Sequence, residues 1–356
     1  MAIINASVTV MAGLNFLAVG DWGGQTGAPF TEAGQVATAK GMGEIGEQVG
    51  SKFVLALGDN FYSNGIGSDA NDARFHQTFE DVYTAESLES TPWYVLSGNH
   101  DWNGNVSAQI EYSALSTRWT YPNYWYNVEE EFTGSDGAEY TFELVMIDTV
   151  IGVGQVDDHD DPHSGISGKH QVVSQAVKDE QTEWLSATLA NSTADFLWVA
   201  GHYPVWSACS HGPTAALVSD LLPLLQQYGA HYMSGHDHCE EWISDSGVEY
   251  ILTGNGDNCC YAANKVGEVP EGSLKYIADS TLNATQGMTG GFTSWNVDSQ
   301  GTTVVFRDQD GAELFTTPPF PARSAAVKEA AAQQRRFSAA EVAVAAAVAA
   351  EAGADI

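Results

Sequence analysis

The sequence predicts an α/β fold with helices on both faces of the β-structure, and three observations support this expectation. First, short apolar runs with the length of buried strands recur at residues 16–19, 53–57, 94–96, 142–147, 196–199, 232–233 and 250–252. Second, longer mixed segments with helical patterns lie at residues 31–49, 106–116, 179–189 and 214–228. Third, the two kinds of segment alternate along most of the chain, as in sheets that are covered on both sides.

The end of the chain has a different pattern. Apolar runs at 292–297, 302–306 and 313–315, with turns at 298–301 and 308–311, predict an antiparallel meander. We divide the 356 residues into an N-terminal extension (1–13), one catalytic core (14–320) and an Ala-rich tail (321–356) that is helical or disordered. The tail is neutral and has few large apolar side chains, so we expect it to be dispensable. Residues 152–170 are acidic and Gly-rich, which predicts an exposed loop.

Composition excludes several classes of protein. Hydrophobic residues make up 44% of the chain, too many for a wholly disordered protein. The net charge of −33 leaves few cations to cluster against nucleic acid or an anionic membrane. No apolar run reaches the length of about 20 residues that a membrane-spanning helix needs. We therefore expect no nucleic-acid and no membrane partner, and we expect bound metal ions to supply the positive charge that an anionic substrate would need.

The cysteines and the glycosylation sequons give information on the cellular compartment of the protein. Cys259 and Cys260 are neighbours, and disulfide geometry disfavours a bond between them. One or two longer bridges, or free thiols, remain for these residues and for Cys209 and Cys239. The apolar start of the chain has no basic residue and makes a poor signal peptide, so we expect that a presequence has been removed. Sequons that favour secretion stand at Asn5, Asn105, Asn191 and Asn283.

Five predicted strands end in a small residue followed by a metal-type ligand. The ligands in question are Asp21, Asp59, Asn99, His202, His236 and His238. The carboxyl ends of parallel strands meet at one edge of a sheet, where ligands bind. His236 and His238 are two residues apart, so in an extended segment both imidazoles face the same side. We therefore expect one metal site at this edge.

The number of donors favours two metal ions. Six ligands are too many for one tetrahedral zinc. They suffice for two ions if one carboxylate bridges, and two ions about 4 Å apart can clamp an in-line displacement at phosphorus. Tyr62 follows Asp59 by three residues. Its phenolate is a hard oxygen ligand, suited to a trivalent ion such as Fe(III).

The motifs GDWG, GDNFY, GNHD, GHYPVWS, HGPT and GHDH occur in this order. They resemble the purple acid phosphatases, in particular the small, tartrate-resistant acid phosphatases of the animal type, over roughly residues 14–317. The resemblance implies a four-layer αββα sandwich of two mixed β-sheets flanked by helices, the metallophosphatase fold. It also implies that phosphate monoesters are hydrolysed by in-line attack of a metal-bound hydroxide.

The resemblance implies a role for each site residue. Fe(III) would be bound by Asp21, Asp59, Tyr62 and His238, and a divalent Fe, Zn or Mn by Asp59, Asn99, His202 and His236. His100 and His211 match the two histidines that meet the phosphate ester, and we expect them to be catalytic. Residues 152–170 stand at the place of the family's protease-sensitive repression loop. Trp102 replaces a histidine of the mammalian proteins, which predicts different substrate contacts.

Other functions stay open at this point. On the same fold, a phosphodiesterase or nucleotide pyrophosphatase is an alternative, and a non-hydrolytic iron-binding protein is another. We expect a monomer in a secreted or lysosome- or vacuole-like setting that acts on a small phosphate ester or a phosphoprotein. For two further carboxylates at the strand ends, we expect mainly structural roles. Asp148 is expected to form a turn, and Asp101 to cap a loop or orient an imidazole.

Overall fold

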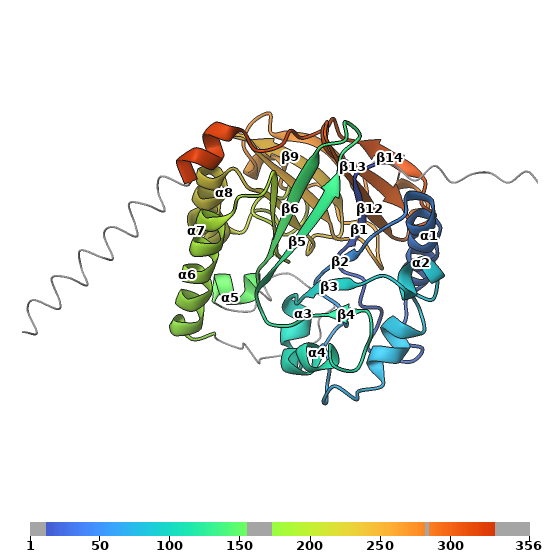
Figure 1. The fold of residues 1–356 in the computed structure, drawn as a ribbon. Helices are drawn as coiled ribbons and strands as arrows, with labels where there is room; N and C mark the ends of the chain where they lie inside the picture. Colours follow the sequence, from blue (N-terminus) through green and yellow to red (C-terminus); the bar gives the residue numbers. More distant parts are fainter. Residues whose placement is uncertain (1–11, 155–172, 282–284, 332–356) are drawn as a thin grey trace, which may run out of the picture.

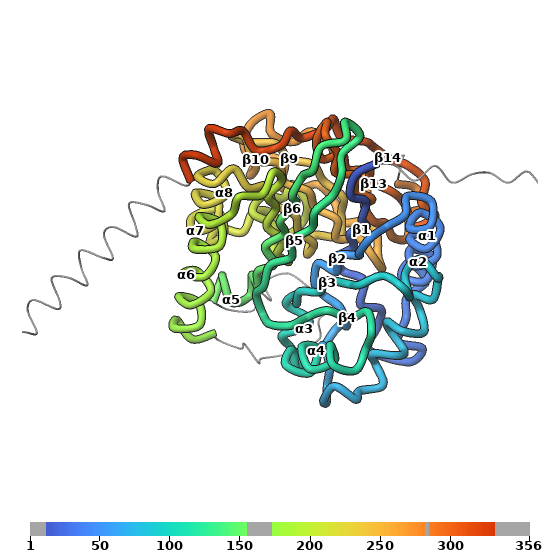
Figure 2. The backbone as a smooth tube through the Cα atoms, viewed as in Figure 1, coloured from blue at the N-terminus to red at the C-terminus, as the bar shows by residue number. Residues whose placement is uncertain are grey.

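The structure is a computed structural model that describes residues 12–154, 173–281 and 285–331. Two seven-stranded mixed sheets pack face to face, with helices on both outer sides (Figure 1). The predicted α/β class and the four-layer αββα sandwich are therefore confirmed. In the smooth trace of Figure 2, α6, α7 and α8 lie on one flank of the sandwich and α1 and α2 on the opposite flank.

The first sheet has the order β14-β13-β12-β1-β2-β3-β4. Strands β1 to β4 run parallel, and the predicted meander β12–β14 joins β1 antiparallel. The strands are β1 Leu14–Val19, β2 Val54–Leu57, β3 Trp93–Leu96, β4 Trp119–Thr120, β12 Gly291–Asp298, β13 Gly301–Asp308 and β14 Glu313–Thr316.

The second sheet has the order β11-β9-β10-β8-β7-β6-β5. Its centre, β6, β7, β8 and β10, is parallel, and β5, β9 and β11 are antiparallel to their neighbours. The strands are β5 Tyr126–Thr133, β6 Glu139–Met146, β7 Phe196–Ala200, β8 His231–Ser234, β9 Glu240–Asp245, β10 Val248–Thr253 and β11 Leu274–Ala278.

The α-helices are α1 Ala33–Val49, α2 Glu86–Glu89, α3 Asn99–Trp102, α4 Val106–Tyr112, α5 Thr149–Val153, α6 Gln175–Asn191, α7 Ala215–Asp220 and α8 Leu222–Tyr228. A π-helix spans Phe75–Glu80 and a 3₁₀ turn spans Val266–Glu268. The segment predicted as one helix over 214–228 is divided in two, because Pro223 in the first turn of α8 has no N–H to continue the helix before it.

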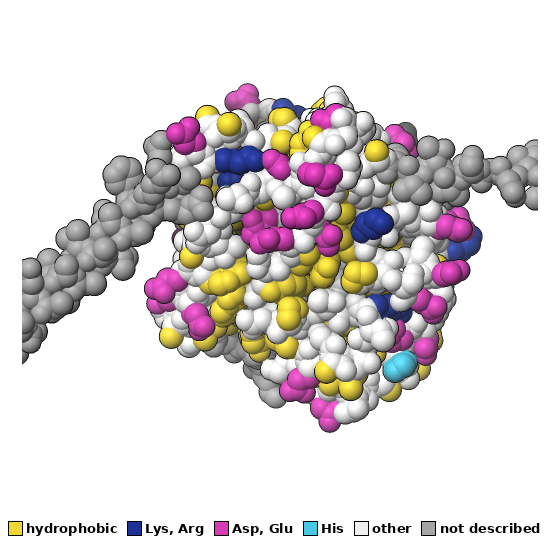
Figure 3. Space-filling model, in the orientation of Figure 1, with side chains coloured by type: hydrophobic (Ala, Val, Ile, Leu, Met, Phe, Trp, Pro, Cys, Tyr) yellow, Lys and Arg dark blue, Asp and Glu magenta, His cyan; other side chains and the backbone are white. Residues whose placement is uncertain are grey.

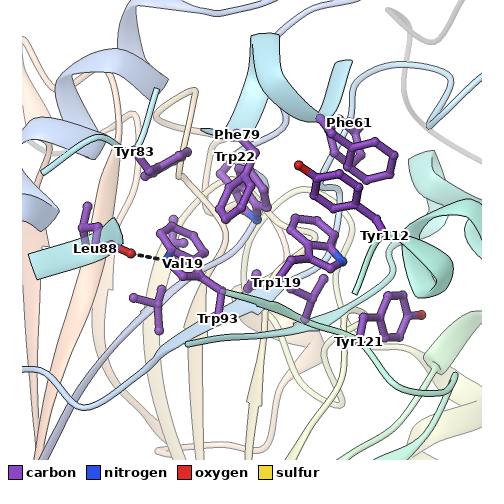
Figure 4. Packing of buried hydrophobic residues seen from close by; sticks show 14 of the residues in the cluster. Val19, Trp22, Phe61, Phe79, Tyr83, Leu88, Trp93, Tyr112, Trp119 and Tyr121 are labelled. Carbon is purple, nitrogen blue, oxygen red and sulfur yellow. Dashed lines mark hydrogen bonds between the residues drawn. The ribbon is translucent and has the colours of Figure 1, made fainter. Parts of the chain in front are cut away.

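Alternating side chains separate the layers of the core. In β2, Val54 and Ala56 face the helix side, whereas Leu55 and Leu57 face the other sheet. The layer between the sheets includes Phe16, Leu144 and Trp198, and a third cluster joins the second sheet to α6–α8. Buried aromatic rings surround Trp22 below the rim of the first sheet (Figure 4). These layers hold the strand ends in fixed positions.

Four strands were missed by the sequence analysis: β4, β5, β9 and β11. Strand β5 reads YNVEEEFT and lies at the sheet edge, where only Phe132 is fully buried, so it has no apolar run. Strand β9 begins with two glutamates, Glu240 and Glu241, that are nevertheless buried. Their burial depends on tertiary contacts rather than on composition.

The expectation for Cys259 and Cys260 was wrong. The two residues form a disulfide with each other, across a cis peptide bond that brings their Cα atoms to 3.1 Å. Cys209 and Cys239 form the second disulfide, with a sequence separation of 30. No helix among the described residues is both long and apolar enough to cross a membrane.

Candidate metal centre

The five predicted strand ends meet at one edge of the sandwich. Asp21 follows β1, Asp59 follows β2 and Asn99 follows β3 in the first sheet, whereas His202 follows β7 and His236 follows β8 in the second. Ligand atoms of Asp21, Asp59 and His202 all lie within 4.8 Å of one another. Packing of the two sheets thus brings donors from both into one buried cluster.

Backbone conformation directs three of these side chains into the cluster. Asp21, Asp59 and His236 have φ angles of 57°, 51° and 73°. Residues other than glycine seldom adopt this left-handed region, and such residues concentrate at functional sites. Each of the three stands two residues after the last residue of its strand, at the edge where the other donors lie.

One side of the cluster contains Asp21, Tyr62 and His238. The Tyr62 hydroxyl donates to Asp21 Oδ1 at 3.0 Å and lies 3.1 Å from His238 Nε2. The second carboxylate oxygen, Asp21 Oδ2, accepts the backbone N–H of His236 at 2.7 Å. Three donors of different chemistry, a carboxylate, a phenol and an imidazole, are therefore within contact of one another.

The other side contains Asp59, Asn99, His202 and His236. Asn99 Oδ1 lies 2.9 Å from His202 Nε2, and Asp59 Oδ2 lies 3.4 Å from the same nitrogen. His202 Nδ1 donates to the Leu57 carbonyl, which leaves Nε2 for the site. The His202 and His236 rings are 5.1 Å apart.

The electrostatics of the cluster fit a cationic occupant. Burial, together with the neighbouring Asp59 carboxylate, raises the pKa of Asp21 well above its usual range. Burial lowers the pKa of His238 to about 3 and that of His236 well below its usual range, so both imidazoles keep a free lone pair. Two adjacent buried carboxylates and neutral imidazoles are the donor set that a metal ion neutralises and uses.

His100 and His211 border the cluster without joining the closest contacts. His100 Nδ1 donates to the Ser63 carbonyl at 2.8 Å, and its Nε2 lies 4.0 Å from Asp59 Oδ2. The His211 ring stacks on His236 with centroids 4.2 Å apart. Both imidazoles therefore lie beside the donor cluster, His100 next to Asp59 and His211 against His236.

The sequence analysis predicted only part of what Asp101, Asp148 and Trp102 do beside the cluster. Asp101 caps the turn after β3 by accepting the N–H groups of Gly98 and Asn60, and it contacts no imidazole in the described hydrogen bonds. Asp148 caps α5 and accepts the Trp102 indole N–H at 2.8 Å. Trp102, half-buried, also stacks on Tyr124. Its polar atom is thus engaged with the protein scaffold.

Tyr261 was not predicted at all. Its ring stacks on His238 with centroids 4.5 Å apart and an interplanar angle of 8°, and it lies 5.6 Å from the His211 ring. The sequence near it carries no metal-type motif, so only the fold could place it here. The predicted repression loop at 152–170 lies mostly outside the described residues, and only its first residues belong to the end of α5.

A two-sheet sandwich with a cluster of carboxylate, amide, phenol and imidazole donors at one edge defines a metallophosphoesterase architecture. The sequence profile of the calcineurin-like phosphoesterases matches residues 14–240, and the chain belongs to that family.

Curated relatives narrow the family. The chain is 41% identical over 308 residues to the tartrate-resistant acid phosphatase type 5 of Homo sapiens, a match that covers 85% of this chain and 90% of the relative. The protein of that name from Rattus norvegicus is 40% identical over 307 residues, covering 85% and 89%. Purple acid phosphatase 3 of Arabidopsis thaliana is 33% identical over 311 residues, covering 85% and 76%. The resemblance to purple acid phosphatases is thereby confirmed.

Solved structures support the fold alone. "GAP50 the anchor in the inner membrane complex of Plasmodium" superposes with a TM-score of 0.71 at 23% identity, covering 88% of this chain and 90% of that one. A dimetal phosphatase from Danio rerio reaches a TM-score of 0.50 at 14% identity, covering 88% and 100%.

Proposed function

We propose that this protein is a metal-dependent acid phosphatase that hydrolyses phosphate monoesters at a binuclear centre of Fe(III) and a divalent Fe, Zn or Mn. The observation that carries the proposal is the position of His100 and His211 beside a metal-type donor cluster. Relatives that are 33–41% identical over 85% of the chain and are named acid phosphatases support it.

We assign Asp21, Asp59, Tyr62 and His238 to Fe(III). Contacts among these donors support the assignment, since Tyr62 Oη lies 3.0 Å from Asp21 Oδ1 and 3.1 Å from His238 Nε2. Burial and the two carboxylates raise the pKa of the Tyr62 phenol well above its usual range. Only a strongly polarising cation would therefore hold it as phenolate near neutral pH, and a trivalent ion meets that requirement.

We assign Asp59, Asn99, His202 and His236 to the divalent ion, with Asp59 shared by both. Ligand atoms of Asp59 lie within 4.8 Å of Asp21 in the first group and of His202 in the second, which supports a shared carboxylate. Burial opposes protonation of His202, but Asp59 and Asp21 raise its pKa to about 10. A metal ion bound to its Nε2 would compete with that proton.

When bound, the two ions supply positive charge for the phosphate oxygens and for an entering oxygen nucleophile. The chain's own residues do the rest. The carbonyl of Ser63 can only accept, so His100 carries hydrogen on Nδ1 and presents Nε2 to the substrate. His211 is held by its stacking on His236. Each imidazole can then supply a proton to the leaving oxygen.

The tests are the single variants His100→Ala and His211→Ala. Both are expected to keep metal content and visible colour, and to lose roughly 10²–10⁴-fold in turnover of an alkyl phosphate. The loss should be smaller for nitrophenyl phosphate, because a good leaving group needs less help from an acid. Equal losses on both substrates, or wild-type rates in the double variant, would remove these histidines from the mechanism.

Two alternatives have distinct signatures. A phosphodiesterase or nucleotide pyrophosphatase would turn over an aryl diester faster than the aryl monoester. A non-hydrolytic iron protein would show negligible hydrolysis when fully metallated. The fold alone does not exclude a non-hydrolytic protein, since the structure that superposes with a TM-score of 0.71 is described as an anchor and not as an enzyme. Two histidines beside the donor cluster favour the hydrolase, because a carrier needs neither.

We further propose a secreted or lysosome- or vacuole-like location, a monomeric state, and a small phosphate ester or phosphoprotein as substrate. Two disulfides support an oxidising compartment. Asn105 and Asn191 stand in sequons and are exposed, so both are accessible for glycosylation.

A further inference from the structure

We propose that the Cys209–Cys239 disulfide, together with the buried carboxylates of Asp237 and Glu241, positions His211 for proton donation. This inference rests on the proposed function of His211. It concerns residues 207–212, here called the His211 loop, and residues 237–241, which directly follow His236 and include His238.

The His211 loop contains neither helix nor strand, so side-chain contacts hold its backbone. Asp237 accepts three of its donors: the N–H of His211 at 2.9 Å, the N–H of Gly212 at 3.3 Å and the Ser207 hydroxyl at 2.6 Å. Glu241 accepts the N–H of Ala208 at 3.0 Å. Its Oε1 also lies 3.0 Å from the Ser207 oxygen, whose single proton is donated to only one of the two carboxyl groups at a time. Every one of these acceptors belongs to residues 237–241.

The disulfide makes the same connection covalently. Cys209 lies two residues before His211, and Cys239 lies directly after His238. Both cysteines are fully buried. The loop that carries His211 is therefore joined, by one covalent bond and by the hydrogen bonds of Asp237 and Glu241, to the segment that directly follows His236 and carries His238.

The disulfide also supports the rings that touch His211. With Leu252 it forms a small buried cluster, against which Tyr261 and Ile277 pack. Tyr261 lies 5.6 Å from the His211 ring, and its N–H donates to the His238 carbonyl at 2.8 Å. On its other side the His211 ring stacks on His236 at 4.2 Å. Loss of the two sulfur atoms would leave space beneath the site where the His211 loop and Tyr261 can shift.

A shift of this kind matters because a proton donor acts only within hydrogen-bond reach of the leaving oxygen. A misplacement of about 1 Å is enough to cost on the order of 10²-fold in rate. A bridge of this length also stabilises the folded chain in general. The experiment must therefore separate a positioning effect from a loss of stability.

The decisive measurement is a cycle with Cys209→Ala/Cys239→Ala in the wild-type and in the His211→Ala background. We expect the cysteine variant to lose roughly 10–10²-fold in kcat on an alkyl phosphate and less on nitrophenyl phosphate. Metal content and the visible spectrum should stay unchanged. In the His211→Ala background, the same cysteine change should alter kcat by less than about 2-fold, because the residue it positions is already absent.

If the cysteine variant does not fold, variants of Ser207 and Glu241 test the same positioning role. Ser207→Ala removes the hydroxyl that bridges both carboxylates and should give a smaller loss with the same dependence on the leaving group. Glu241→Gln keeps an acceptor for Ala208 and should restore most of the activity that Glu241→Leu loses. A merely structural role would not produce this difference between alkyl and aryl substrates.

Three results would overturn the positioning role: equal losses on the two substrates, the same loss in the His211→Ala background, or wild-type turnover in folded variants of the bridge and of Ser207. A different result would count against the proposed function instead. If His211→Ala itself has wild-type turnover, then His211 is not a proton donor. That result would contradict the proposed catalytic role of His211, and not the positioning role of the disulfide.

Discussion

A glycine sets the space around Asp59, the proposed bridging carboxylate. A Cβ added to Gly98 would lie 2.5 Å from the Asp59 backbone nitrogen and closer still to Asp59 Oδ1. Contacts below 3.0 Å force something to shift. The neighbour here is the backbone and carboxylate of a proposed metal ligand, in a chain segment with a left-handed φ. The absence of a side chain at Gly98 is thus a requirement of the site.

We expect Gly98→Ala to displace Asp59 and to lower both bound metal and phosphatase turnover by at least roughly 10-fold. The matched control is Gly67→Ala, where a Cβ meets nothing within 4 Å. Elemental analysis and turnover of nitrophenyl phosphate check the outcome. Full metal occupancy in a folded Gly98→Ala protein would contradict the close approach.

Tyr62 is the residue at which colour and metal binding can be separated. If its phenolate binds Fe(III), Tyr62→Phe removes the charge-transfer band while the ring keeps its edge contact with His100, whose centroid lies 4.7 Å away. We expect the band to disappear and the melting temperature to change by less than about 3 °C, since only one hydroxyl is lost. A visible spectrum of the iron-loaded variant decides the point, and an unchanged band would exclude Tyr62 as the chromophore ligand.

At the scale of elements, the C-terminal tail begins with real contacts. Arg323 donates to Ser192 Oγ at 3.0 Å, and Lys328 pairs with Asp195. Ala331 is buried in the cluster between the second sheet and α6–α8. The expectation that the whole tail is dispensable therefore needs correction for residues 322–331, because it considered the size of the side chains and not their partners.

Two truncations test this correction. Deleting residues 322–356 should lower the melting temperature by about 5 °C, since hydrogen bonds of a buried guanidinium and an ion pair are lost. Deleting only residues 332–356 should change it by less than about 2 °C, because that part is Ala-rich and has few large apolar side chains to bury. Thermal unfolding followed by circular dichroism compares the two. A smaller effect of the longer deletion would show that the contacts of 322–331 contribute nothing.

At the scale of the whole molecule, acidic residues far outnumber basic ones, with 46 Asp and Glu against 13 Lys and Arg. On the face shown in Figure 3, Asp and Glu side chains are spread widely, whereas Lys and Arg side chains are few and lie apart from one another. Several carboxyl groups are also buried. Burial raises the pKa of Glu143 and of Asp148, and burial with the neighbouring Asp237 raises the pKa of Glu241 to about 8.

These shifts determine how stability depends on pH. In the unfolded chain Glu241 loses its proton near pH 4.5, but in the folded protein it keeps the proton until about pH 8. Between these values the folded state binds more protons, so stability falls as pH rises. The self-repulsion of the −33 net charge acts in the same direction.

We therefore expect wild-type protein to melt at a lower temperature at pH 8 than at pH 5. Glu241→Gln should reduce this difference in melting temperature, because a glutamine does not titrate. The reduction should be about 2–4 °C for each kcal/mol that the titration of Glu241 contributes to the free energy of unfolding. Comparing the two proteins at equal metal loading cancels the titration of the metal ligands. A difference between pH 5 and pH 8 that is the same in both proteins would show that Glu241 is not protonated in the folded state.

The sequence by itself determined the α/β class, the meander and the list of metal-type donors. Each depends on a local pattern: a buried apolar run, a turn, or a small residue followed by a ligand such as Asp59 or His202. Edge strand β5 and strand β9 were beyond this approach, because their residues are polar and only the neighbouring strands and helices decide which are buried.

Only the tertiary structure decided how the donors are grouped and what supports them. Asp21 and His238 are far apart in sequence, and their contact depends on the packing of one sheet against the other. The pairing of Cys209 with Cys239, the stacking of Tyr261 on His238 and the docking of residues 322–331 likewise join segments that no local pattern relates. The physical reason is that side-chain periodicity determines local conformation, whereas contacts between distant segments depend on how whole layers pack.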